Sequence, residues 1–148
     1  MSAEVQWAAL RNNHSFLVKR DGITFSAEPN NLMNVHSFKF SGLANNKTVG
    51  VKVVKGEKSS RVVVTTKRTK NNATRKPRTQ FADTTLRKHV VKGTCVGAAA
   101  VNTLTAKSYY RADLSRFAIA RYHALTKSLR IKPDAASKKR ELKRKPQK

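Results

Sequence analysis

The sequence is poor in the residues on which disulfides, metal sites and catalytic centres depend. It has a single cysteine, Cys95, among 148 residues, so no internal disulfide can form, and cysteine pairs with metal-ligand spacing are absent. The four histidines show no paired spacing for a metal. The eight acids are scattered, and no phosphate-cradling glycine loop or nucleophile elbow occurs. The sequence therefore predicts an intracellular protein with no catalytic residue, no metal and no cofactor.

Long apolar segments are also missing. The longest apolar-leaning run covers residues 96–104 and is interrupted by Asn102 and Thr103. It is far shorter than the roughly 20 residues that span a bilayer. The N-terminal residues are acidic and lack an apolar core, which disfavours a signal or transit peptide. We therefore expect no membrane partner.

Positive charge is what the chain has in excess. It carries 32 Lys and Arg against 8 Asp and Glu, a net charge of +24 with a pI near 11.1. A protein this positive repels itself unless a polyanion neutralises it. Residues 1–60 hold 8 basic and 4 acidic residues, whereas residues 61–148 hold 24 and 4. A merely solvated surface mixes both signs, so the second part is expected to bind nucleic acid.

RNA fits this pattern better than DNA. Helix-turn-helix, zinc-finger and leucine-zipper signatures are absent, and so are the Gly-x-x-Gly clamp and the aromatic sheet motif of common RNA modules. What remains is a small folded body with long basic extensions, which suits insertion into a large folded RNA. An anionic membrane surface is the less favoured polyanion, because the aromatic residues of the long C-terminal helix are typical of a protein core.

The first 66 residues predict a small mixed module. Ser2 can cap a short helix over residues 2–12, in which Trp7 either packs in the core or stacks on a base. Asp21-Gly22 predicts a hairpin over residues 15–26. In that register one face is apolar and is expected to be buried; it consists of Phe16, Val18, Ile23 and Phe25.

Three further strands are predicted over residues 36–40, 48–54 and 61–66. The intervening Glu28-Pro29-Asn30-Asn31 string is either a simple loop or a turn that makes a specific contact.

The remainder predicts a basic connector, helices and a tail. Residues 67–80 contain no acid and almost no apolar residue, so they cannot fold alone. Helices are predicted over residues 83–92, 97–107 and 113–130, with Asp83 capping the first and Asp113 the last. The last has an apolar stripe of Leu114, Phe117, Ala118, Tyr122, Leu125 and Leu129.

The predicted fold class is thus α+β: a small antiparallel sheet with an N-terminal helix, then a basic connector, C-terminal helices and a basic tail. The boundaries are 1–66 for the module, 67–82 for the connector, 83–131 for the helical RNA-binding region and 132–148 for the tail.

Lysine and arginine on extended segments neutralise phosphates and release counterions, and arginine also binds phosphate oxygens bidentately. For Arg121 a helix-packing role competes, since it lies beside the apolar stripe. The predicted RNA-binding residues are Lys67, Arg68, Lys70, Arg75, Lys76, Arg78, Arg87, Lys88, Arg111, Arg116, Arg121, Lys138, Lys139 and Arg140.

A series of short strings resembles one known family. In order they are Gln6-Trp7, Arg11-Asn12, Ser15-Phe16-Leu17, Lys19-Arg20, Glu28-Pro29-Asn30-Asn31-Leu32, Ser37-Phe38, Gly42-Leu43, Lys47-Thr48-Val49-Gly50-Val51, Arg75-Lys76-Pro77, Thr84-Thr85 and Tyr110-Arg111-Ala112-Asp113-Leu114. Across residues 2–130 the chain is similar to the eukaryote-specific large-subunit ribosomal protein family of number twenty-eight. The resemblance implies an α+β N-terminal module, a basic helical C-terminal part and no catalytic residues.

The resemblance also implies the function and the partners. We expect a structural constituent of the cytoplasmic large ribosomal subunit that binds and stabilises large-subunit rRNA. It would contact neighbouring ribosomal proteins, would not be a homo-oligomer, and would pass through the nucleus and nucleolus during assembly. The alternatives are a basic ribosome-assembly or chromatin-binding protein and an RNA-modifying enzyme.

Overall fold

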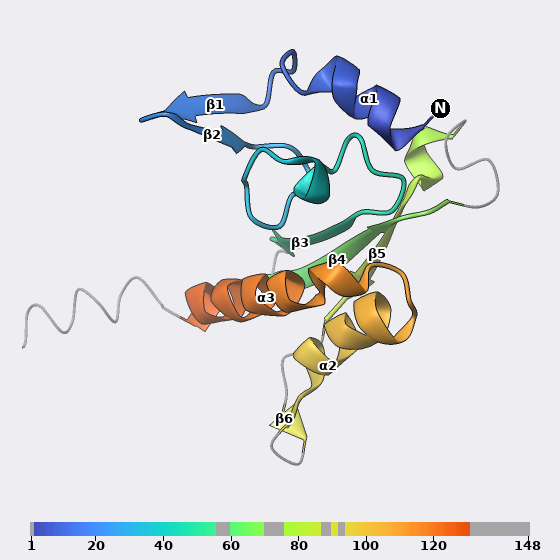
Figure 1. The fold of residues 1–148 in the computed structure, drawn as a ribbon. Coiled ribbons are helices and arrows are strands. Elements are labelled where there is room, and N and C mark those ends of the chain that lie inside the picture. The colour runs from blue at the N-terminus through green and yellow to red at the C-terminus, as the bar shows by residue number, and fades with distance from the viewer. Residues whose placement is uncertain (1, 56–59, 70–75, 87–89, 92–93, 131–148) are drawn as a thin grey trace, which may run out of the picture.

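The protein is built in layers around a three-stranded sheet (Figure 1). The computed structural model describes residues 2–55, 60–69, 76–86, 90–91 and 94–130. The C-terminal helices cover one side of the sheet, and the N-terminal helix, a hairpin and a long loop lie on the other side. The predicted α+β class is confirmed. The main elements are α1 (Ala3–Leu10), β1 (Leu17–Arg20), β2 (Ile23–Ser26), β3 (Val49–Val54), β4 (Arg61–Lys67), β5 (Phe81–Thr85), α2 (Val96–Asn102) and α3 (Ser115–Arg130).

The sheet is antiparallel in the order β3-β4-β5. Val51 pairs with Val64, and Val64 pairs in turn with Thr84. Because side chains alternate across a strand, alternate valines of β3 and β4 form one apolar face, against which α3 packs. The core cluster is Leu32, Val49, Val51, Val62, Val64, Leu86, Val101, Leu114, Ala118 and Tyr122. The two predicted Val-rich strands and the apolar stripe of the last helix are therefore confirmed.

The helix predicted over residues 83–92 is wrong, because its first part is strand β5. Residues Phe81 to Thr85 pair along β4, with Asp83 opposite Thr65. The Asp83 carboxylate is not a cap: it accepts from the Thr65 hydroxyl at 2.6 Å and pairs with Lys52 at 2.9 Å. The β-branched Thr84 and Thr85 disfavour a helix and suit a pleated strand, and an open edge of β4 was available to pair with them.

The hairpin has the predicted register but not the predicted burial. Arg20 pairs with Ile23 and Val18 with Phe25, on either side of the Asp21-Gly22 turn. Its apolar face is nevertheless open: Phe16, Val18, Ile23 and Phe25 are 37%, 40%, 55% and 38% exposed. The hairpin lies apart from the three-stranded sheet (Figure 1), so no described strand covers that face.

The strand predicted over residues 36–40 is also wrong. Residues Phe38–Phe40 form a single 3-10 turn. The Asn45 amide donates to the carbonyls of Phe38 and Ser41 at 2.6 and 2.9 Å, and these bonds hold the chain in a turn. The side chain of Trp7 packs on this region, with its ring 4.9 Å from His36 and 5.8 Å from Phe38. This agrees with the packing role for Trp7.

The helix ends differ in detail from the predictions. Ser2 caps α1 as expected, since its hydroxyl accepts from the N–H of Glu4. The helix predicted over residues 97–107 is α2 followed by a π-helical turn, Thr103–Lys107. Asp113 was wrongly expected to cap the last helix; it lies inside a 3-10 turn, Ala112–Leu114, that precedes α3. Short pieces complete the description: 3-10 turn Pro77–Thr79, β6 (Val90–Val91) and β7 (Thr94–Cys95).

Candidate nucleic-acid interface

A basic groove lies where the start of the chain approaches the end of β4. Its volume is about 580 Å³. Three cations line it, Lys47, Lys67 and Arg68, and no acidic side chain is among the described residues of its wall. The remaining lining residues offer amide and hydroxyl groups: Gln6, Asn46, Thr69 and Gln80. Such a wall matches a sugar-phosphate backbone, because cations meet phosphates while amides and hydroxyls bond sugar and phosphate oxygens.

The groove is held in shape by Tyr110. The Tyr110 hydroxyl donates to the carbonyl of Lys67, and it accepts from the N–H of Thr48 at 3.2 Å. It thereby joins the ends of β3 and β4, and burial raises the pKa of the phenol. The Lys47 ammonium lies 5.6 Å from the Tyr110 ring centre. Tyr110 therefore positions two of the three groove cations.

Lys67 is the least solvated of the three cations. Its ammonium donates to the carbonyl of Asn45 at 3.1 Å, and burial lowers its pKa. A phosphate placed in the groove would favour the charged form again, because opposite charges stabilise each other at short range.

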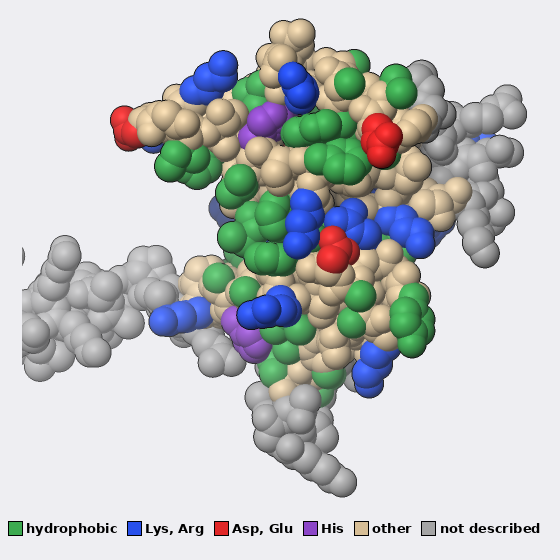
Figure 2. Space-filling model, viewed as in Figure 1, with side chains coloured by type: hydrophobic (Ala, Val, Ile, Leu, Met, Phe, Trp, Pro, Cys, Tyr) green, Lys and Arg blue, Asp and Glu red, His purple; other side chains and the backbone are tan. Residues whose placement is uncertain are grey.

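Basic side chains continue beyond the groove. Figure 2 shows a row of Lys and Arg side chains across the middle of the face in view, between the N-terminal layer and the helices. Arg111 binds the main chain next to the groove: its guanidinium donates to the carbonyls of Lys39 and Lys47, both at 3.0 Å. It also binds Asp113 bidentately at 2.9 and 2.8 Å, and this bond lowers the pKa of Asp113. Arg111 thus ties the loop segments to the start of α3.

Arg121 has a similar internal role. Its side chain donates to the carbonyl of Val51 at 3.2 Å and to that of Leu32 at 2.7 Å. Val51 lies in β3 at the edge of the sheet, and Leu32 follows the Glu28–Asn31 loop. The helix-packing role is therefore the one that these bonds support, and phosphate contact by Arg111 or Arg121 stays a prediction.

The other predicted contacts divide into three groups. Arg116 and Lys76 are exposed, as is Arg68, and are open to a partner. Arg78 lies in a described turn, but its side chain is not described. The following predicted residues lie outside the described part of the chain: Lys70, Arg75, Arg87, Lys88, Lys138, Lys139 and Arg140.

Two cations of this surface were missed from the sequence. Lys39 and Lys47 stand alone among neutral residues, so a search for basic runs passes over them. The Glu28–Asn31 loop is more than a simple loop: Glu28 is 4% exposed and accepts from the Asn31 amide at 3.0 Å and the Ser41 hydroxyl at 3.1 Å. The acidic and amide residues of that string indicate from the sequence that its side chains can bond one another.

Over the described residues, no helix has the length and apolar character needed to cross a membrane. In the same residues, His, Cys, Asp and Glu do not gather in groups of three that could hold a metal ion.

Known proteins resemble the chain over nearly its whole length. It is 35% identical to the large ribosomal subunit protein eL28 of Dictyostelium discoideum, over 94% of this chain and 97% of that protein. It is 35% identical to the protein of the same name from Schizosaccharomyces pombe, over 92% and 98%. The corresponding Trypanosoma cruzi protein is 33% identical, over 86% and 78%. The Ribosomal L28e protein family matches residues 5–128, and the chain belongs to that family.

Proposed function

We propose that the chain is a structural constituent of the cytoplasmic large ribosomal subunit, where it binds and stabilises rRNA beside other ribosomal proteins. Its family membership and the names of its relatives support this role. We infer that it carries no enzymatic activity, that it is not a homo-oligomer, and that it passes through the nucleus and nucleolus during assembly.

The observation that carries the RNA-binding part is the basic groove. Lys47, Lys67 and Arg68 converge there with neutral hydrogen-bonding side chains between them. Each phosphate neutralised by a cation releases condensed counterions, which favours binding. The net charge of +24 would attract RNA over the whole surface, and the groove would then select one stretch of backbone.

The basic segments outside the groove would add contacts. We infer that the connector over residues 67–82 and the tail over residues 132–148 bind phosphates and hold RNA segments together, while residues 1–66 and 83–131 supply the folded body. In the described residues, however, both ends of the connector belong to the sheet, because β4 ends at Lys67 and β5 begins at Phe81.

Subunit incorporation tests the groove. A chain with Lys47→Glu and Arg68→Glu should compete poorly with the wild-type chain for incorporation into large subunits. When both chains are present in equal amounts, the large-subunit fraction of a sucrose gradient should contain at least tenfold less of the variant. A matched control carries Lys19→Glu and Arg20→Glu, two exposed cations of the hairpin. Equal incorporation of the two variants would contradict the groove assignment, provided that circular dichroism shows both to be folded.

A second variant tests the connector. Arg75→Glu, Lys76→Glu and Arg78→Glu together should abolish incorporation while leaving the folded body intact, and normal incorporation would contradict this role. The wild-type chain should sediment with large subunits and translating ribosomes, and ribonuclease should release it. Sedimentation only with immature particles would instead indicate an assembly factor.

A further inference from the structure

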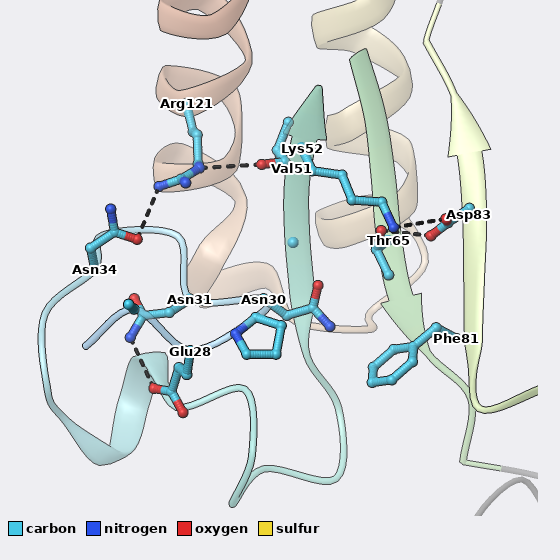
Figure 3. A pocket seen from close by; sticks show the side chains of 13 residues that line it. Glu28, Asn30, Asn31, Asn34, Val51, Lys52, Thr65, Phe81, Asp83 and Arg121 are labelled. Carbon is cyan, nitrogen blue, oxygen red and sulfur yellow. Dashed lines mark hydrogen bonds and ion pairs between the residues drawn. The ribbon is translucent and has the colours of Figure 1, made fainter. Parts of the chain in front are cut away.

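A second cavity lies on the face of the sheet away from α3, separate from the basic groove. Its volume is about 500 Å³, within the range of sites that hold small organic groups. The Glu28–Asn31 loop forms one wall and strands β3 to β5 form the other (Figure 3). We call it the sheet pocket; it is lined by Ala27, Glu28, Pro29, Asn30, Asn31, Asn34, Gly50, Val51, Lys52, Thr65, Phe81, Asp83 and Arg121.

The formal charges that line the sheet pocket balance: Lys52 and Arg121 stand against Glu28 and Asp83. Lys52 and Asp83 lie 2.9 Å apart, and the Thr65 hydroxyl also donates to Asp83. The Arg121 guanidinium binds main-chain carbonyls. The described wall of the pocket therefore carries no net formal charge, and it favours an uncharged ligand.

Asn30 offers the pocket a free amide. Within the described residues its side chain makes no hydrogen bond. Its backbone has φ +64°, a conformation that asparagine tolerates better than most residues. A Cβ at Gly50 would lie 2.1 Å from the Asn30 Oδ1, so the glycine makes room for the amide to lie against the sheet.

The rest of the loop fixes Asn30 in this position. Glu28 is buried and binds both Asn31 and Ser41. A Cβ at Gly42 would lie 2.0 Å from the carbonyl oxygen of Pro29, so the loop packs closely against the segment that contains Gly42. The backbone that carries Asn30 is thus preorganised, and a ligand would have to order only the side-chain amide.

Phe81 supplies an apolar surface opposite this amide. It lies in β5, is 38% exposed, and its ring points across the pocket toward Asn30 in Figure 3. An open aromatic ring facing a free amide matches a flat heterocycle, which stacks through its face and hydrogen bonds through its edge. Proteins recognise single-stranded RNA bases in this way.

We propose that the sheet pocket receives one unstacked base of large-subunit rRNA, with its face on Phe81 and its edge on the Asn30 amide. The inference rests on the proposed function. An amide presents a donor beside an acceptor and so suits a base edge that offers the complementary pair, as adenine does. An apolar side chain from a neighbouring protein would leave the Asn30 amide unpaired at a cost.

Site-directed crosslinking in assembled large subunits tests the proposal. The photoreactive residue p-benzoylphenylalanine replaces Phe81, and in a matched control it replaces Phe16, which has nearly the same exposure at 37%. A third chain carries it at Arg68 in the basic groove. Position 81 should crosslink to a single nucleotide, position 68 to rRNA, and position 16 to no such nucleotide.

The outcomes separate this inference from the proposed function. If position 68 reaches rRNA but position 81 reaches only protein, or nothing, the base site is overturned and the ribosomal role stands. If the chain is absent from large subunits, both are overturned.

A substitution of Asn30 tests the hydrogen bond. Asn30→Asp keeps the size of the side chain but removes its N–H donors, so it should lower the crosslink yield from position 81 about tenfold, the discrimination typical of one bidentate base contact. Asn12→Asp adds the same charge at an exposed site and should leave the yield unchanged. An unchanged yield with Asn30→Asp would overturn the assignment of Asn30.

Discussion

Arg111 and Arg121 show what a count of charges leaves out at the scale of single residues. Both lie in a strongly basic chain, yet each guanidinium binds main-chain carbonyls of segments distant in sequence. Arginine suits this role because its planar fork carries five donors and stays charged. The sequence identifies such a residue as a cation but cannot identify its acceptors, which are backbone groups brought close by folding.

At the residue scale we predict that Arg121→Ala destabilises the free protein. It removes charged hydrogen bonds to the carbonyls of Val51 and Leu32, so the free energy of unfolding in urea should fall by about 2 kcal/mol. The matched control is Arg116→Ala, one turn and a half earlier on α3, where the side chain is exposed. Its effect on stability should stay within about 0.5 kcal/mol. Equal losses in the two variants would contradict the internal role of Arg121.

At the scale of elements, the periodicity of apolar residues predicted the secondary structure correctly where the apolar pattern was long. The apolar stripe and the Val-rich strands over residues 48–54 and 61–66 were predicted, and their residues form the core or pack against it. Short segments were decided by their neighbours instead. Residues 81–85 became a strand because β4 had an unpaired edge, and residues 38–40 became a turn because Asn45 binds the main chain there.

The hairpin and the three-stranded sheet should contribute differently to stability, because their apolar side chains are buried to different degrees. Val64 in the central strand is 0% exposed, whereas Ile23 in the hairpin is 55% exposed. Val64→Ala should therefore lower the free energy of unfolding by about 2 kcal/mol, through lost burial and the cavity that remains. Ile23→Ala should cost less than about 0.5 kcal/mol. A larger loss at Ile23 than at Val64, measured by urea unfolding, would contradict the open position of the hairpin.

For the whole molecule, the dominant quantity is the net charge of +24. Ion pairs are few in the described residues, namely Lys52 with Asp83 and Arg111 with Asp113. Most positive charges of the free chain therefore repel one another, and repulsion of this kind opposes the compact state. An RNA partner would remove it.

Salt should imitate part of that effect. We expect the thermal unfolding midpoint of the free full-length chain to rise by several degrees when NaCl increases from about 20 mM to about 300 mM, because ions screen the repulsion. Sodium sulfate at equal ionic strength should raise the midpoint further, because sulfate also favours burial through its exclusion from the protein surface. A midpoint that falls with NaCl would contradict net repulsion.

The sequence alone predicted a polyanionic partner and determined the α+β class and the long elements, because net charge is a sum over residues and periodicity is local. The string that includes Asn30 was already noticeable, but its two interpretations could not be separated. Only the tertiary structure decided that Lys47 joins Lys67 and Arg68 in one groove, that Arg121 faces inward, and that Asn30 meets Phe81 across a pocket. Each of these depends on contacts between residues far apart in the chain, which a local pattern does not encode.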